Sequence, residues 1–342
     1  MKPRLLFIAP KFFGYYKEII REAASLGYDV DYICDAPSNT SFSKAMTRVC
    51  KKVVPLLSKR YFNGQILLKI TQKSYDYVLL LAAMTFALTP EMVDEIRRMN
   101  PKARFVIYQW DSEQNLPYVK DIHQYFDVRY SFDRRDCVSD TGYRFLPLFY
   151  TRLYEQISKR PKEEFRYDCA YIGTAHPKKL HDVNAVIAAL QGWMPKRYIY
   201  HYMPSRLKYF YHKVTAPEYR GARLCDFEMQ KLSGEQIERV FCASKVILDA
   251  QQAGQTGLTI RTIECIGAMK KLITTNKDVM NYDFYRPENV LVFDEKKIPN
   301  RKELEAFFNT EYQQLPEPIY QKYALRNWLG EVLSGTTEGN RR

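Results

Sequence analysis

The sequence predicts an α/β protein of two doubly wound, Rossmann-like domains that face a cleft. Short apolar runs of strand length alternate with segments whose apolar residues recur at helical spacing, which is typical of parallel sheets covered by helices on both faces. The alternation occurs twice, on either side of a polar, charged stretch at residues 151–166 that we interpret as a linker. The 342 residues also exceed the length that one hydrophobic core usually supports. We therefore expect a small-molecule site in a cleft between two domains.

The N-terminal half begins with an apolar strand and a helix that stops at a glycine. The strand is residues 5–9, and the helix at 16–26 is followed by Gly27, which suits a C-terminal cap. Further strands are predicted at residues 30–34, 77–83, 105–108 and 128–132, and a further helix at residues 90–99. We take residues 1–155 as the first domain.

The same alternation restarts after the linker. Strands are predicted at residues 169–172, 197–202, 246–248, 272–275 and 290–293. Helices are predicted at residues 180–190, 234–243, 258–269 and 302–308, and a last one at about 318–333. We take residues 165–316 as the second domain and residues 317–334 as a terminal helix that crosses back to the first.

Charge and cysteine usage limit the class of protein. The chain has 52 basic and 39 acidic side chains, a formal charge of +13, which favours nucleic acid, an anionic membrane or phosphorylated substrates as partners. Its seven cysteines are scattered without a C-x-x-C pair, which favours free thiols in a reducing compartment over disulfides or a zinc site. Because no apolar stretch approaches about 18 residues, we expect a cytoplasmic protein whose membrane contact is peripheral, at the inner face.

The segment from Ser244 to Asn276 is the most informative part of the chain. It combines an apolar run, a polar loop with glycines, a helix-period segment and a second apolar run. The N-terminus of such a helix presents backbone N–H groups to an anion. Arg261 could neutralise phosphate and Glu264 could accept hydrogen bonds from vicinal hydroxyls, so the segment suits a sugar nucleotide. Two other interpretations stay open: an exposed ion pair between these two residues, and a capping role for Thr259.

Several motifs together resemble one enzyme family. They are Tyr171-Ile-Gly173, Asp226-Phe-Glu228, Ser244-Lys-Val-Ile-Leu-Asp249 and Gly257-Leu-Thr-Ile-Arg-Thr-Ile-Glu264, with Tyr108-Gln-Trp-Asp-Ser112 and Phe132-Asp-Arg-Arg-Asp136 in the first half. The chain resembles bacterial glycosyltransferases of the GT-B fold over nearly its whole length. Within them it is similar to the branch of CgeB-like spore-maturation proteins and capsule or lipopolysaccharide transferases.

The resemblance implies a nucleotide-sugar donor on the C-terminal domain and an acceptor on the N-terminal domain. Glu264 would hold the donor ribose. The loop after the domain's first strand would include Gly173 and Thr174, and the residues facing the diphosphate would be Gly257, Leu258, Thr259 and Arg261. Many retaining members have a second glutamate eight positions before the first, where this chain has Thr256. The stereochemical outcome therefore stays open.

A catalytic base is expected after the strand at residues 105–108. Asp111 follows this strand and could take the proton of the acceptor hydroxyl, with Trp110 beside it at the acceptor site. A turn or helix-capping role is the alternative for Asp111, and Glu113 is a weaker rival base. The resemblance makes Lys11 and Gly14, in the first strand-to-helix loop, candidate acceptor contacts, and a surface lysine is an equal alternative for Lys11.

Other charged groups have competing interpretations. Asp133 and Asp136 with Arg134 and Arg135 favour a solvated ion-pair network. The donor contacts predicted in the loop that opens at Gly173 are His176 and Lys178, although Lys178 and Lys179 could be merely solvated.

We predict neither a metal nor a cofactor other than the donor substrate. The histidines lack metal-ligand spacing, and the D-x-D match at residues 29–31 is far from the donor motif. Helix dipoles and cationic side chains would offset the charge of the leaving diphosphate instead.

Basic and aromatic residues interleave between Arg197 and Arg223. This mixture suits an anionic bilayer or a lipid-phosphate acceptor, single-stranded nucleic acid, or a tyrosine-rich core helix with solvated lysines. We expect a metal-independent glycosyltransferase of cell-envelope assembly, acting on a lipid-linked or polysaccharide acceptor, and expect no nucleic-acid partner. The alternative is a non-catalytic nucleic-acid-binding or scaffold protein with a degenerate transferase fold.

Overall fold

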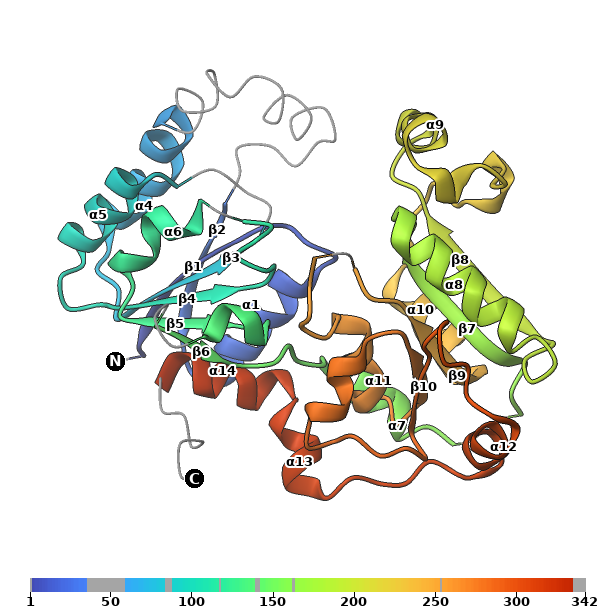
Figure 1. Ribbon diagram of the computed structural model, residues 1–342. Coiled ribbons are helices and arrows are strands. Elements are labelled where there is room, and N and C mark those ends of the chain that lie inside the picture. Colours follow the sequence, from blue (N-terminus) through green and yellow to red (C-terminus); the bar gives the residue numbers. More distant parts are fainter. Residues whose placement is uncertain are drawn as a thin grey trace. The chain divides into compact units, whose positions relative to one another are not determined.

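The computed structural model of the chain describes residues 2–35, 59–83, 88–116, 118–138, 142–161, 164–252 and 254–334. These residues form two compact units (Figure 1). Unit 1 comprises the residues up to Pro147 together with those from Leu325 onward, and unit 2 comprises Leu148–Ala324. Each unit is an α/β layer structure with its own parallel sheet, which confirms the predicted fold class.

Unit 1 contains a six-stranded sheet in the order β2-β1-β3-β4-β5-β6. Its strands are β1 (Arg4–Ala9), β2 (Asp29–Cys34), β3 (Tyr77–Ala82), β4 (Arg104–Gln109), β5 (Val128–Ser131) and β6 (Tyr143–Phe145). Every neighbouring pair is parallel. The order reverses direction between β1 and β3, and open sheets of this kind bind ligands beyond the strand ends at that reversal.

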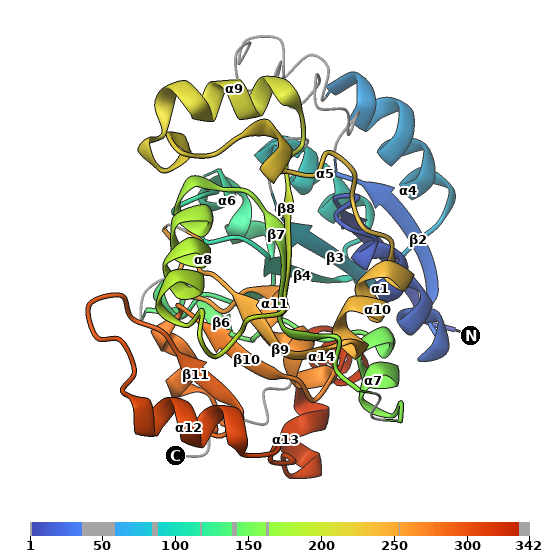
Figure 2. The same ribbon diagram turned by 90° about the vertical axis from the view of Figure 1, so that its right-hand side faces the viewer.

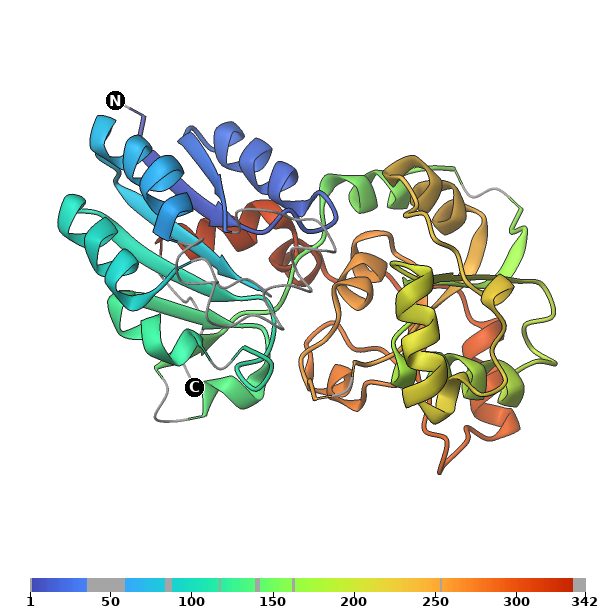
Figure 3. The ribbon, with the colours of Figure 1, turned by 90° about the horizontal axis from the view of Figure 1, so that it is seen from above.

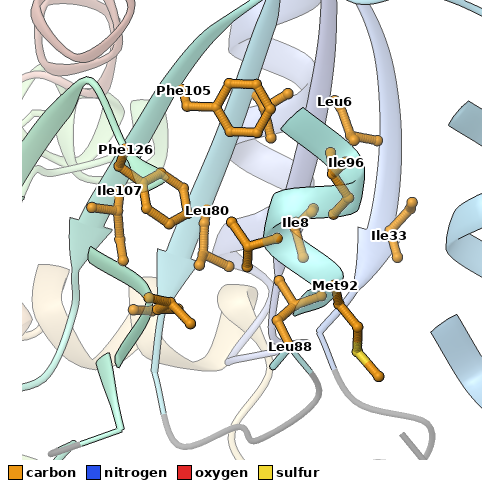
Figure 4. Packing of buried hydrophobic residues seen from close by; sticks show 14 of the residues in the cluster. Leu6, Ile8, Ile33, Leu80, Leu88, Met92, Ile96, Phe105, Ile107 and Phe126 are labelled. Atoms are coloured by element: carbon orange, nitrogen blue, oxygen red, sulfur yellow. The ribbon is translucent and has the colours of Figure 1, made fainter. Parts of the chain in front are cut away.

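Helices cover both faces of this sheet because the strands are apolar on both sides. One face packs against the π-helical turn Phe62–Leu67, α4 (Leu68–Gln72), α5 (Pro90–Met99) and α6 (Val119–Ile122). Figure 4 shows this core, in which Leu6 and Ile8 of β1 pack with Met92 and Ile96 of α5. The other face packs against α1 (Tyr15–Ser25) and α14 (Leu325–Ser334), and the Trp328 ring lies 4.8 Å from that of Tyr108 in β4.

The C-terminal segment forms two helices where one was expected at residues 318–333. The structure has α13 (Glu317–Lys322) in unit 2 and α14 in unit 1. Between them the carbonyl of Tyr323 accepts a hydrogen bond from the backbone N–H of Tyr150 at 2.8 Å, and Ala324 forms a parallel bridge with Tyr150. This pairing takes the backbone groups that a continuous helix would use, so the helix breaks there.

Unit 2 contains a five-stranded parallel sheet in the order β11-β10-β9-β7-β8. Its strands are β7 (Tyr167–Thr174), β8 (Arg197–Tyr202), β9 (Ser244–Asp249), β10 (Lys271–Thr274) and β11 (Val290–Val292). Here the direction reverses between β7 and β9. Beyond the end of β8 lies α9 (Arg206–Thr215), as Figure 2 shows.

Both faces of this second sheet are also covered. On one face, α8 (Pro177–Ala189) and α12 (Arg301–Asn309) bury Val183, Val186 and Phe307 against β7, β9, β10 and β11. On the other face lie α7 (Arg152–Ser158), α10 (Gly234–Cys242) and α11 (Ile260–Gly267).

The segment expected to be a linker is partly helical. Helix α7 occupies Arg152–Ser158, within the polar stretch at residues 151–166. Its Tyr154 and Ile157, three residues apart, are buried, because they fall on the face that packs against α10 and α11. The charged residues of the segment lie on the remaining faces, so composition alone gives a linker pattern here.

None of the helices in the described part of the chain is long and apolar enough to cross a membrane. The six cysteines within the described ranges are free thiols, of which Cys169 and Cys265 are buried, and Cys50 lies outside those ranges.

Candidate functional site

The predicted donor residues of unit 2 gather around the ends of β7 and β9, where the strand order reverses. The segment after β7 contains His176, Lys178 and Lys179, and the segment after β9 leads through Gly257 to α11. The sheet therefore brings together two stretches of sequence that are about eighty residues apart. In open α/β sheets this is the usual position of a ligand site.

Helix α11 begins at Ile260, with Thr259 at the N-cap position. The Thr259 side chain accepts no hydrogen bond from the first turn; its Oγ1 instead donates to Asp249 Oδ2 at 2.5 Å. Thr262 Oγ1 donates to the same carboxylate oxygen at 2.9 Å. The side chain of Asp249, at the end of β9, thus anchors the start of the helix, and the capping interpretation of the Thr259 hydroxyl is wrong. No side-chain cap competes with an anion for the first turn.

The loop before α11 is held by the segment after β10. Asn276 Nδ2 donates to the carbonyl oxygens of Thr256 and Gly257, at 3.0 and 3.2 Å. The backbone N–H of Gln251 donates to Thr275 Oγ1 at 3.0 Å. Leu258 points into the core, so only its backbone could face a ligand. These bonds fix the loop in place, which is the kind of preorganisation that a phosphate site requires.

Arg261 and Glu264 form a buried ion pair. Arg261 NH1 lies 2.7 Å from Glu264 Oε2, and the Glu264 side chain is fully buried. The same NH1 donates to Tyr154 Oη of α7 at 3.3 Å, and the guanidinium carbon lies 5.2 Å from the ring centroid of Phe241 in α10. Burial raises the pKa of Tyr154 well above its usual range.

The alternative interpretation of an ion pair therefore holds, but the pair is inside unit 2 and not on its surface. The ribose contact of Glu264 and the diphosphate contact of Arg261 stay predictions. In this structure both side chains join α11 to its neighbouring helices.

The two adjacent lysines at the start of α8 differ in their surroundings. Lys178 is exposed, as a solvated lysine would be, and its ammonium group pairs with the largely buried carboxylate of Asp182, one turn later. Lys179 is partly buried, and among the residues that the structure describes it makes no hydrogen bond or ion pair. Desolvation lowers the pKa of its ammonium group; Asp249 and Asp182 oppose this shift and Arg261 adds to it. Lys179 therefore shares the electrostatic environment of the β9 end and the first turn of α11.

The sequence interpretation named Lys179 among two lysines that could reach phosphate but chose Lys178 as the donor contact, although a signal for Lys179 was present. Lys179 is four residues before Val183 and seven before Val186, so it falls on the inward apolar face of α8. A lysine on the inward face of a helix is unusual, and it indicates that the ammonium group has a role inside the protein. His176 is the N-cap residue of α8, and burial lowers its pKa to about 4, so its imidazole is neutral at pH 7.

Gly173 and Thr174 were expected in a loop but are the last residues of β7. Gly173 pairs with His201 and Thr174 with Tyr202 of β8. A Cβ atom at Gly173 would lie 2.3 Å from Tyr171 Oη, so glycine there lets the buried tyrosine fold back over the strand. Their contact with the donor stays a prediction.

In unit 1 the predicted acceptor residues lie within a cluster of aromatic rings. Phe12 and Phe13 are exposed, and their ring centroids are 4.5 Å apart. Trp110, after β4, lies 5.6 Å from Tyr15 and 6.4 Å from Phe12 between ring centroids. The loop after β1 thus places its aromatic rings next to Trp110, which follows β4. Of these rings, the sequence analysis predicted only Trp110 as part of the acceptor site. Exposed rings of this kind suit the apolar face of a sugar ring.

The backbone of this loop is strained at Phe13. Phe13 has φ 42° and Gly14 has φ 87°, so two consecutive residues adopt the left-handed region. Gly14 does this without steric cost, whereas a phenylalanine in this region costs about 1–2 kcal/mol. Strain at an exposed aromatic residue is typical of a functional loop. Lys11 is exposed at the start of the same loop.

The two candidate bases of unit 1, Asp111 and Glu113, both have hydrogen-bond or ion-pair partners. Asp111 Oδ1 accepts hydrogen bonds from the Ser112 N–H at 2.9 Å and from Asn115 Nδ2 at 2.8 Å, the pattern of a turn aspartate. The rival base Glu113 is paired with Lys120 at 2.8 Å. The base role of Asp111 stays a prediction.

Asp133 and Asp136 are buried, so the expected solvated ion-pair network is wrong. Asp133 Oδ1 caps the short helix Arg134–Cys137 by accepting from the Arg135 N–H at 3.0 Å. Asp136 accepts from Ser131 Oγ at 2.6 Å and from the Glu113 N–H at 3.2 Å. Desolvation raises the pKa of Asp136 to about 6, assisted by the charges of Asp133 and Glu113.

Known structures share this architecture. A glycosyltransferase from Rickettsia africae is 13% identical, with a TM-score of 0.57 over 99% of this chain and 100% of that one. An alpha-glucosyltransferase in complex with UDP and mismatched DNA is 13% identical, with a TM-score of 0.56 over 97% and 95%. The lipopolysaccharide outer core galactosyltransferase WaaB is 10% identical, with a TM-score of 0.53 over 97% and 99%.

These likenesses show the fold of the chain, which is that of GT-B glycosyltransferases. No protein-family model and no curated protein matches the sequence. The resemblance to the CgeB-like and capsule branch stays a prediction.

Proposed function

We propose that the chain is a glycosyltransferase that takes its sugar from a nucleotide donor bound at the ends of β7 and β9. The observation that carries the proposal is Lys179, an ammonium group that is partly buried without a partner in the described residues. Removing a cation from water without a carboxylate in direct contact is unfavourable, so such a group is expected where an anionic ligand supplies that contact. The uncapped first turn of α11 adds backbone donors for the same anion.

The proposed reaction transfers the sugar to an acceptor hydroxyl. The acceptor oxygen forms a bond to the anomeric carbon as the bond between that carbon and the diphosphate oxygen breaks. The hydroxyl proton passes to a base, for which we propose Asp111, and the nucleoside diphosphate leaves. Lys179 and the α11 N-terminus would stabilise the negative charge that develops on the leaving group, without a metal ion.

The proposed acceptor is a saccharide, lipid-linked or part of a polysaccharide, in cell-envelope assembly. The exposed rings of Phe12 and Phe13, with the half-buried ring of Trp110 beside them, support a sugar acceptor in unit 1. The shared fold with a lipopolysaccharide galactosyltransferase supports an envelope pathway. A lipid-linked acceptor would bring the enzyme to the inner face of the membrane.

Titration calorimetry of the full chain with UDP, GDP, CDP, dTDP and CMP tests the donor site. We expect one of these nucleotides to bind, and Lys179→Ala to weaken that binding at least tenfold because the diphosphate loses its counter-charge. Lys178→Ala is the matched control, because this neighbouring lysine is paired with Asp182, and it should stay within threefold of wild type. Folded protein that binds none of the nucleotides would remove the proposed function.

The acceptor assignment needs a separate assay. The donors in this assay are sugar conjugates of whichever nucleotide binds, and the acceptor probes are octyl glycosides. At a fixed acceptor concentration, Phe13→Ala and Trp110→Ala should each lower the rate of sugar transfer and keep the nucleotide affinity. Transfer rates equal to that of wild type for both variants would contradict the acceptor role of the ring cluster.

A further inference from the structure

Helix α9 of unit 2 turns an apolar face to solvent. Its exposed side chains are Leu207 (80%), Phe210 (56%), Tyr211 (63%) and Val214 (87%). Their spacing of three, four and seven residues places all of them on one face of the helix. Figure 3 shows α9 (yellow) on the near side of unit 2. We call these four residues the α9 stripe.

The inward face of α9 buries Tyr209 in a small apolar cluster and turns the Lys213 ammonium group toward backbone carbonyls, and these contacts fix the orientation of the helix. Lys213 Nζ donates to the carbonyl oxygens of Tyr219, Arg220 and Ala222, at 2.9, 2.6 and 2.8 Å. Tyr209 is buried, and its Oη donates to the Ala222 carbonyl at 3.1 Å. A rotation that buried the α9 stripe would break all of these bonds. Helix α9 therefore holds a lysine inward and an apolar stripe outward, whereas the lysines of a surface helix usually face water.

The surroundings of the α9 stripe are basic. Between residues 206 and 223 the chain has five basic side chains, of which Lys213 faces inward, and one acidic side chain, Glu218. Arg206 and Arg220 are exposed, and the exposed guanidinium of Arg223 lies 3.4 Å from Asp226 Oδ1. An apolar strip with a cationic rim is complementary to a surface that has hydrocarbon beneath anionic groups.

We propose that the α9 stripe is a docking surface for an anionic lipid bilayer, on which α9 lies in the plane of the headgroups. Leu207 and Val214, the two most exposed members, decide between a bilayer and single-stranded nucleic acid. Bases stack on aromatic rings, whereas these two aliphatic side chains offer no ring and suit acyl chains. The inference rests on α9 alone and not on the proposed sugar transfer, although a lipid-linked acceptor would agree with it.

Vesicle co-sedimentation of the full chain tests this surface. Vesicles of phosphatidylcholine with 30% phosphatidylglycerol should bind the protein at least tenfold more tightly than pure phosphatidylcholine vesicles, and added salt should weaken binding because the basic rim contributes. Leu207→Glu combined with Val214→Glu should lower binding to the anionic vesicles at least tenfold. Arg206→Glu combined with Arg220→Glu should remove the preference for anionic lipid.

Ile298→Glu is the matched control, because Ile298 is 53% exposed in unit 2 but outside α9. It should bind vesicles as wild type does. Each variant is first checked for an unchanged thermal midpoint and nucleotide affinity, so that misfolding is not mistaken for lost docking.

Other results would overturn the proposal. The proposal is wrong if wild-type protein does not bind anionic vesicles. It is also wrong if the Leu207→Glu, Val214→Glu variant binds them as tightly as wild type does. Self-association or oligonucleotide binding through the α9 stripe, without vesicle binding, would also overturn the proposal. Folded wild-type protein that binds vesicles but none of the nucleotides would remove the proposed function and keep the docking proposal.

Discussion

Glu264 and Arg261 form an ion pair, three residues apart on α11, in which the carboxylate is fully buried and the guanidinium nearly so. The pair is enclosed by Tyr154 and Phe241, so it joins three helices on one face of the unit 2 sheet. A glutamate that the sequence suggests as a ligand thus has a structural partner, and the two roles predict different consequences of mutation.

Glu264→Ala should lower the free energy of unfolding by about 3–5 kcal/mol, because it leaves the Arg261 guanidinium buried without its counter-charge. Urea unfolding followed by circular dichroism measures this. The double variant Arg261→Met with Glu264→Leu should recover most of the loss, because it removes both charges. If Glu264→Ala instead leaves stability unchanged and only weakens nucleotide binding, the ligand role predominates.

Asp111→Asn should abolish turnover, by about a hundredfold or more, because the amide cannot take the acceptor proton. Its carbonyl oxygen still accepts the bonds from the Ser112 N–H and Asn115 Nδ2, so the turn and the nucleotide affinity should be kept. Initial rates and calorimetry on one preparation separate these effects. Glu113→Gln is the control, and an inactive Glu113→Gln with an active Asp111→Asn would exchange the two roles.

Asp136 should make the protein less stable as the pH rises. Its pKa is raised to about 6 in the folded state, above the ordinary value of 3.8, so the folded state holds the proton more tightly than the unfolded state. Between about pH 4 and 6 the unfolded state loses its proton first, and wild type should lose roughly 2–3 kcal/mol relative to Asp136→Asn. Urea midpoints at pH 4, 5, 6 and 7 test this; a pH-independent difference between the two proteins would refute it.

Gly267→Ala should destabilise unit 2. The added Cβ would lie 2.4 Å from Cγ of Tyr150, whose ring is buried and held by its Oη bond to the Tyr320 carbonyl at 3.1 Å. Overpacking of this kind costs about 1–3 kcal/mol or more. Gly192→Ala is the control, because no atom lies within 4 Å of its added Cβ, and it should be neutral or slightly stabilising. Equal unfolding midpoints for the two variants would show that Tyr150 can move aside.

The periodicity of apolar residues predicts most of the fold because each strand is buried on both faces. Helix α5 at Pro90–Met99 and strand β8 at Arg197–Tyr202 have the predicted bounds. Proline at the first turn marks the start of α5, and Asn100 follows its end. These signals are local, so they can be read without knowledge of the tertiary structure.

Helices α7 and α13 depend on contacts distant in sequence. The burial of Tyr154 is evident only once α10 and α11 are placed against it. The break between α13 and α14 follows from the pairing of Tyr150 with Ala324. A window of neighbouring residues contains neither contact.

The candidate site shows the same division. The loop and helix around Gly257–Glu264 could be placed from the sequence, whereas the burial of each charge could not. Lys178 and Lys179 are the same residue type in adjacent positions, and only the inward face of α8 separates a solvated lysine from a desolvated one.

The return of α14 to unit 1 has a consequence for biosynthesis. Trp328, Leu329 and Val332 complete the unit 1 core, yet the ribosome makes them only after the whole of Leu148–Ala324. During translation the face of β4 that Trp328 covers stays open, while unit 2 already has every strand of its sheet. Unit 2 can therefore finish folding first, and a nascent chain that stops early leaves apolar surface of unit 1 uncovered for chaperones and proteases to find.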